Sequence, residues 1–134
     1  MEAECAHRGK PSVVAGCIEL LEGHGADDDL VRALGGPHAD LVLSGREGGR
    51  DGYWPRVWGC RGLLYAWDPA AVPAVMRATA DPAWRVREMA AKVVARQCPE
   101  EALSAIVVMM EDPVPRVRAA AERAVARLYR HSCH

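Results

Sequence analysis

The sequence predicts an all-α protein built as a short α-solenoid, in which pairs of helices stack one on the next. Residues that favour helices, above all Ala, Leu, Arg, Met and Glu, are abundant, whereas Phe and Asn are absent and Thr occurs once. A segment recurs after 31 residues. Asp-Pro pairs separate the apolar stretches, where they can end one helix and start the next. The 134 residues give room for one domain with a packed core.

The repeat is clearest in the second half of the chain. Residues 81–96 read DPAWRVREMAAKVVAR, and residues 112–127 read DPVPRVRAAAERAVAR. A weaker copy, WPRVWGCRGLLYAW over residues 54–67, aligns at an offset of 29. Units of this length bury their apolar faces against their neighbours, which makes a solenoid. We therefore expect a repeat domain over 37–131, with repeats at about 37–67, 68–98 and 99–130.

Residues 1–36 are less regular, and we expect this helical segment to cap the solenoid. Residues 12–23 carry apolar side chains at helical spacing and are followed by glycines, which end helices. The acidic run 27–29 can begin a short helix that reaches Leu34. Beyond the break at 35–37, residues 38–43 predict another short helix, and the Gly-rich residues 44–52 predict a flexible loop.

The repeat domain begins with a predicted helix over 53–67. In each Asp-Pro pair the acid can cap a helix whose first residue is the proline, so helices are expected to begin at Pro69, Pro82 and Pro113. The first of these spans 69–79 and tolerates Pro73 in its first turn. Another helix is expected over 99–111, and residues 131–134 are expected to fray.

The recurring pattern DPxxRVRxxA resembles the HEAT repeat family, in particular the short HEAT-like repeats of the phycobilin lyase type. The resemblance covers about 37–130, is strongest over 69–130, and implies a right-handed α-α superhelix. It also implies that the helix with the Val-Arg pair lines the concave side and that a ladder of Asp and Arg joins the repeats. The matching ladder and cap residues here are Asp81, Arg87, Asp112 and Arg118.

The first copy departs from this pattern, because Trp58 replaces the ladder arginine and Gly52 stands at the aspartate position. Members of the family include scaffolds, lyase subunits, an iron hydroxylase and nucleic-acid binders, so the resemblance is specific for the fold and not for an activity. The iron-type members use His-Glu pairs, which this sequence lacks.

Helical geometry places a set of cations on one face of the aligned helices. Residues at the aligned positions share a side because a helix turns about 100° per residue. Glu88 is the one acid on this face, and Gly59 and Leu63 fall on it in the first copy. The ladder arginine occupies a different position, so folding alone gives no reason for cations here. We define the Arg-rich face, the expected binding surface, as Arg56, Trp67, Arg85, Lys92, Arg96, Arg116, Arg123 and Arg127.

Five of the seven aromatic residues fall within 53–67. Trp54, Trp58 and Tyr65 share a helical face with Arg61, a composition found in interfaces. The same positions in the next copy should pack between repeats, so the preferred interpretation is that these large side chains fill a gap beside the irregular N-terminal segment.

The remaining signals exclude more than they suggest. The five scattered cysteines form no CxxC pair and indicate reduced thiols in a cytoplasm, and we expect neither a signal peptide nor a membrane span. The terminal His131, Cys133 and His134 lack the spacing of a zinc site. No arrangement of nucleophile, base and orienting acid is visible, so catalytic residues, metals and cofactors are not expected.

The function predicted from the sequence is a non-catalytic scaffold or protein-binding module that holds an acidic segment of a partner protein on the Arg-rich face. Two alternatives stay open: a nucleic-acid-binding protein that uses the same cations, and a subunit of a lyase-like or modifying enzyme. The Arg-over-Lys and Ala-rich composition also suggests a bacterial source.

Overall fold

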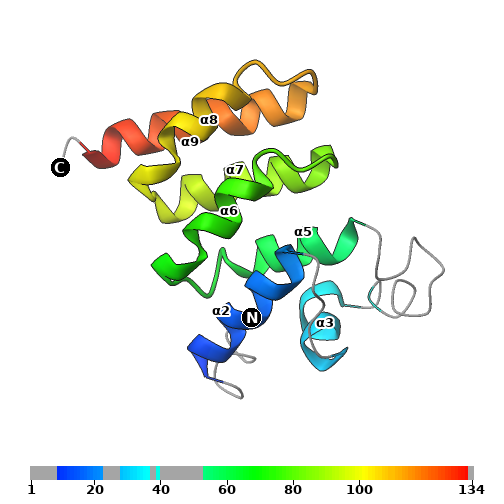
Figure 1. Cartoon of the computed structure of the whole chain (residues 1–134). Coiled ribbons are helices and arrows are strands. Elements are labelled where there is room, and N and C mark those ends of the chain that lie inside the picture. Colours follow the sequence, from blue (N-terminus) through cyan, green and yellow to red (C-terminus); the bar gives the residue numbers. More distant parts are fainter. Residues whose placement is uncertain (1–8, 23–27, 37–38, 40–52, 133–134) are drawn as a thin grey trace. The chain divides into compact units, whose positions relative to one another are not determined.

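The computed structural model describes residues 9–22, 28–36, 39 and 53–132, and within these ranges it contains helices and no strand (Figure 1). The chain divides into two compact units, Met1–Ala71 and Val72–His134. The first unit contains the helices α2 (Lys10–Leu21), α3 (Asp28–Gly35), α5 (Trp54–Gly62) and the 3-10 helix η2 (Pro69–Ala71). The second contains α6 (Val72–Ala78), α7 (Trp84–Gln97), the 3-10 helix η3 (Glu100–Ala102), α8 (Leu103–Met109) and α9 (Pro115–Ser132).

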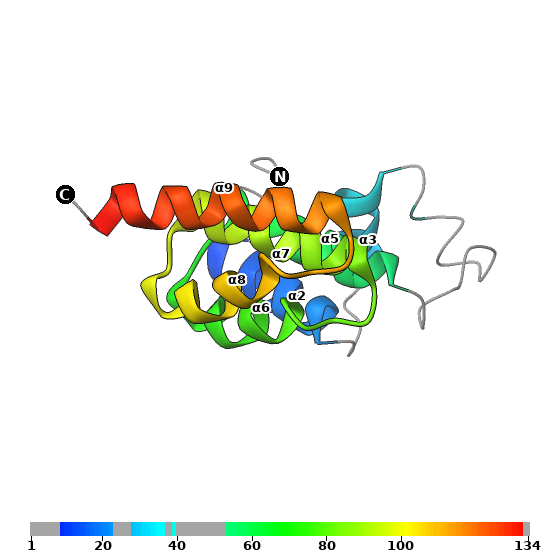
Figure 2. The ribbon, with the colours of Figure 1, turned by 90° about the horizontal axis from the view of Figure 1, so that it is seen from above.

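The second unit consists of two helix hairpins, α6 with α7 and α8 with α9. Helices α7 and α9 lie on one side and α6 and α8 on the other, as Figure 2 shows from above. The main packing between the hairpins joins α7 to α9. Its core is built from small and β-branched side chains that repeat in register, such as Val86 and Val117, or Ala90 and Ala121, all fully buried. Small side chains let the two helices approach closely, which places their polar side chains within bonding distance.

The first unit packs α2 and α3 on α5. Gly59 of α5 lies directly under α2: a Cβ atom at this residue would be 2.6 Å from the carbonyl oxygen of Cys17 and 2.8 Å from Cβ of Leu20. Trp58 is 2% exposed, and its indole ring fills the space beside Gly35 at the end of α3. Residues 1–36, expected to cap the solenoid, therefore share a unit with the first predicted repeat.

Several predicted helix bounds differ from the structure. The helix expected over 53–67 ends at Gly62, because the amides of Leu63, Leu64 and Tyr65 bond to carbonyls three residues back in turns that follow the glycine. The helices expected over 69–79 and 99–111 each begin with a 3-10 turn, η2 and η3. At the C-terminus α9 continues through Ser132, so residues 131 and 132 are helical where fraying was expected. The predicted helix over 38–43 and the loop over 44–52 lie outside the described residues, apart from Ala39.

Candidate functional site

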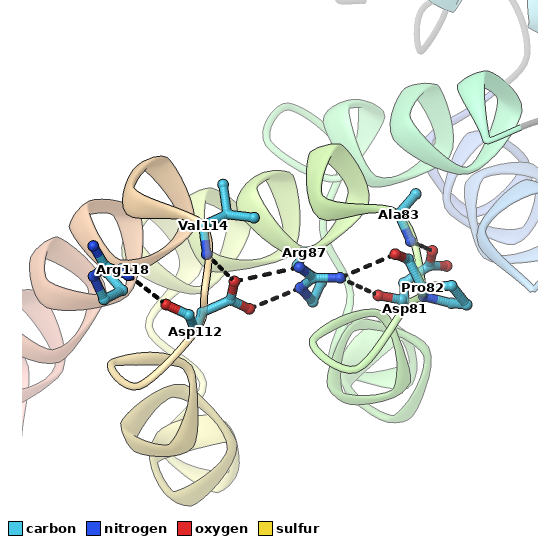
Figure 3. Close-up of polar contacts among 7 residues, drawn as sticks. All are labelled: Asp81, Pro82, Ala83, Arg87, Asp112, Val114 and Arg118. Atoms are coloured by element: carbon cyan, nitrogen blue, oxygen red, sulfur yellow. Dashed lines mark hydrogen bonds and ion pairs between the residues drawn. The ribbon is translucent and has the colours of Figure 1, made fainter.

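The ladder arginine of the second unit lies at the centre of a hydrogen-bonded array (Figure 3). Arg87 projects from the first turn of α7, and its Nε donates to Oδ2 of Asp112 at 2.8 Å while Nη2 donates to Oδ1 at 3.3 Å. Its Nη1 donates to the backbone carbonyls of Asp81, at 2.8 Å, and Pro82, at 3.1 Å. One guanidinium thus ties the loop before α7 to the loop before α9, and a planar fork of donors suits this two-sided role.

The two aspartates of the array bind backbone amides just before the helices. Oδ1 of Asp81 accepts from the amide of Ala83 at 2.8 Å, and Oδ1 of Asp112 accepts from that of Val114 at 2.9 Å. These are turns of the kind that Asp favours two residues ahead of an amide. Helices α7 and α9 begin at Trp84 and Pro115, so the expected starts at Pro82 and Pro113 are two residues early. The backbone carbonyls of Asp81 and Pro82 accept hydrogen bonds from Arg87 and are therefore part of the ladder.

The electrostatics of Asp112 follow from this position. Burial raises the pKa of its carboxyl, but the hydrogen bonds from Arg87 and from the amide of Val114, together with the charges of Arg87 and Arg118, outweigh burial and hold the pKa below its ordinary value. Arg118, the next ladder position, donates from Nη1 to the backbone carbonyl of Asp112 at 2.7 Å. The Asp112 carboxylate is therefore ionised at neutral pH and held by the arginine of the preceding repeat.

The Arg-rich face is partly structural in the second unit. Arg116 of α9 reaches back to α7, where its Nε donates to Oε2 of Glu88 at 2.9 Å and its Nη2 to Oε1 at 3.2 Å. The side chain of Glu88 is only 9% exposed, and Lys92 lies 4.0 Å from it. The guanidinium groups of Arg85 and Arg116 lie over the ring of Trp84, at 4.7 and 5.1 Å from its centroid. The expectation that folding gives no reason for a cation at Arg116 is therefore wrong, because this arginine neutralises a buried carboxylate.

The other cations of α7 and α9 make fewer contacts within the protein than Arg116 does. Arg96 and Arg123 are exposed, the side chain of Lys92 is 40% exposed, and Arg127 is exposed while its Nε donates to the carbonyl of Ala95 at 3.3 Å. Arg116 and Arg127 both reach from α9 to α7, so these two cations lie at the contact between the two helices.

The first unit holds the other members of the Arg-rich face. Arg56 and Trp67 are half-buried, and Gly59 and Leu63, which the helical wheel placed on the same face, are fully covered. Helix α2 explains this difference for Gly59, because it packs directly over that residue. No register argument could show this, since α2 has no counterpart in the repeat.

The aromatic cluster of 53–67 is divided between core and surface. Trp58 is core, Trp54 stacks on it with ring centroids 6.3 Å apart, and Tyr53 lies 5.0 Å from Trp54. Arg61 donates to the carbonyl of Leu34, while Tyr65 is 61% exposed. A shallow pocket at this point is lined by Ala33, Leu34, Arg61, Gly62 and Tyr65.

The sequence analysis did not predict that Trp84 lies under Arg85 and Arg116, or that Glu88 is buried and paired with Arg116. The signal was present in the sequence, because Glu88 and Arg116 are 28 residues apart, which is one helical turn less than the repeat. The two residues therefore face each other across stacked helices.

The last feature is the set of metal-binding and thiol side chains among the described residues. No group of three His, Cys, Asp or Glu side chains within them could hold a metal ion. Cys17 and Cys60 are buried thiols.

A family model of HEAT repeats matches residues 53–126, more than half of the chain. No curated protein matches the sequence significantly, and no solved structure does. The match runs from α5 into α9 and includes the ladder, whereas the phycobilin lyase type stays a prediction. Repeat register, helix pairs and ladder agree with this match, and the chain belongs to the HEAT repeat family.

Proposed function

We propose that this chain is a non-catalytic protein-binding module that holds an acidic segment of a partner protein on the Arg-rich face. HEAT repeats commonly mediate protein–protein interaction. The observation that carries the proposal is the excess of cations over acids on α7 and α9. Six cations occupy matched positions there, and the one acid among those positions, Glu88, is buried and bound by Arg116.

These cations divide into two groups with different roles in the proposal. Arg85 and Arg116 are held over Trp84 at the start of α7, which fixes one end of the surface. Lys92, Arg96 and Arg123 lie further along the two helices, and their side chains reach solvent. Exposed charges contribute little to stability, whereas aligned charges raise the rate at which an oppositely charged partner is captured. Arg56 and Trp67 stand at the matching repeat positions of the first unit.

The proposal is tested with a fluorescently labelled Glu-rich peptide as the probe, by anisotropy at about 50 and about 300 mM salt, since screening weakens such binding. We expect Arg96→Glu and Arg123→Glu each to weaken binding about threefold or more without changing the melting temperature. Lys10→Glu, an equal change of charge at an exposed site on α2, is the matched control. Equal losses in all three variants would reduce the effect to net charge and contradict the proposal.

A second arm decides between the two classes of partner. A DNA duplex with the same label is titrated under the same conditions. If the duplex binds more tightly than the peptide, with a steep dependence on salt, the nucleic-acid alternative is favoured.

Within the described ranges, no helix has both the length and the apolar character needed to cross a bilayer.

A further inference from the structure

Helix α9 presents a face that repeats, 31 residues later, the face of α7 that α9 itself covers. On α7 this face carries the partners of α9: Trp84 and Glu88 contact Arg116, the carbonyl of Ala95 accepts from Arg127, and Arg87 binds Asp112. The same register on α9 gives Pro115, Arg118, Ala119, Glu122 and Ala126. Pro115, Glu122 and Ala126 are exposed, and no element of the described part of the second unit packs over them. Figure 2 looks from above onto α8 and α9 side by side.

Arg118 on this face keeps hydrogen-bond donors that its counterpart uses. Arg87 makes four hydrogen bonds, two of them to the carboxylate of Asp112. Arg118 makes the equivalent bond to the carbonyl of Asp112, but its Nε and Nη2 have no acceptor among the described residues. The position therefore matches a carboxylate-binding site whose ligand is not supplied by the described part of this chain.

Glu122 lies one turn further along the same face, at the position where α7 has Ala91. Ala91 is fully buried, whereas Glu122 is exposed. A carboxylate at this point is costly to cover unless the covering surface brings a cation. Whatever packs here must therefore offer a carboxylate to Arg118 and a cation to Glu122, at the spacing of one helical turn.

We propose that a second copy of this chain packs on this face, with the two α9 helices antiparallel about a two-fold axis. In an isologous interface every contact between two different residues occurs twice, once on each side of the two-fold axis. Arg118 would therefore bind the partner's Glu122, and Glu122 would bind the partner's Arg118. Ala119, between them, is small enough for close approach of the helices. Arg116 and Arg127 of the Arg-rich face reach from α9 to α7, whereas this interface is centred on Arg118 and Glu122, so it goes beyond the proposed function.

Exposed apolar side chains on α8 and α9 also support packing against a second copy of this chain. Four of the five large apolar side chains that the described residues expose belong to α8, the residue that follows it, and α9: Val107, Val108, Met110 and Tyr129. Val108 is 72% exposed and Tyr129 is 57% exposed. Antiparallel pairing centred between residues 118 and 122 would bring Tyr129 near the partner's Met110. Burying these apolar side chains would add hydrophobic free energy to the charge pairs.

The first experiment measures the mass of the full chain by light scattering and sedimentation at protein concentrations up to about 1 mM, where even weak association is visible. We expect a rise from the 14.5 kDa of one chain to twice that mass. A constant mass of one chain over the whole range would overturn the proposal.

The second experiment locates the interface by charge reversal. Arg118→Glu makes this face wholly acidic and Glu122→Arg makes it wholly basic, so each variant alone should dimerise about tenfold or more weakly. An equimolar mixture of the two variants should restore dimers, because each pair then joins opposite charges. Restoration requires the two residues to meet between chains, since a pair within one helix gains nothing from mixing.

Two controls keep the outcome decisive. Glu101→Arg makes the same charge change on the exposed surface of η3 and should leave dimerisation unchanged. If Arg118→Glu fails to fold because it loses its bond to Asp112, Glu122→Arg is compared with Glu101→Arg and with Glu122→Gln, which should weaken dimerisation less. A dimer that persists equally in Glu122→Arg lies elsewhere and contradicts the proposal.

Discussion

The two units join their helices by different means at the same repeat positions. Trp58 and Gly59 of α5 align with Arg87 and Glu88 of α7. In the first unit the indole fills the space beside α3, and the missing side chain at Gly59 admits α2. In the second unit the arginine binds Asp112 and the glutamate binds Arg116.

This comparison shows that a repeat position fixes where a side chain lies but not how it holds its neighbour. A helix with a register partner can be joined by charged hydrogen bonds that recur along the ladder. Helices α2 and α3 have no such partners in the repeat, so their packing relies on the shape of the side chains. The first unit should therefore respond to changes of volume, and the second to changes of charge and pH.

The largest effect is expected for Trp58→Ala. Truncating a buried aromatic side chain in a packed core costs about 3–5 kcal/mol of unfolding free energy. Hydrogen exchange should show the loss first in α2 and α3, and chemical denaturation gives its size. The neighbouring Trp54 is only half-buried, so Trp54→Ala should cost less. Equal losses of unfolding free energy in the two variants would contradict the view that shape complementarity at Trp58 holds the first unit together.

A smaller loss is expected for Asp112→Ala, which removes the acceptor of two bonds from Arg87 and leaves that cation mostly buried. We expect about 2–3 kcal/mol, because an uncompensated charge adds to the lost hydrogen bonds. Asp68→Ala is the matched control. Its carboxylate binds the amide of Ala70 at 2.8 Å and no described arginine, so its loss should cost only about 0.5–1 kcal/mol. Thermal melts that show equal losses would remove the special role of the ladder.

Gly59→Ala should destabilise the first unit by about 1–2 kcal/mol, although Ala favours helices more than Gly does. The added Cβ would meet the carbonyl oxygen of Cys17, which is backbone and yields little. Ala119→Gly, at the same repeat position on α9, should cost no more than the difference in helix propensity. A stabilised Gly59→Ala variant would show that α2 can move away from α5 at no cost.

The smallest effect concerns pH. The pKa of folded Asp112 lies below its value of about 3.9 in an unfolded chain, so ionised Asp112 stabilises the fold above that pH. The contribution is lost as the pH falls from about 4 through the folded pKa. The stability difference between the wild type and Asp112→Asn should therefore shrink below about pH 4 in denaturation curves. A difference that stays constant from neutral to acid pH would contradict the assignment.

The sequence by itself determined the all-α class, the spacing of the repeats and the positions of the ladder residues. These depend on local signals, such as Asp-Pro pairs and apolar periodicity, and on the recurrence after 31 residues that the last two copies reveal. The structure places Arg87 and Asp112 together because both are repeated in register.

Only the tertiary structure decided which residues are covered and what they meet. The spacing of Glu88 and Arg116 allows them to meet, but only the structure shows that the carboxylate is buried and that Arg116 neutralises it. The sequence could not show that α2 covers Gly59 or that the helix of the first copy ends at Gly62. The first two depend on neighbours that are remote in the sequence, and α2 lies outside the shared repeat positions. The free energy of a buried charge or of a close helix contact depends on the surrounding atoms, and the residue type alone does not specify them.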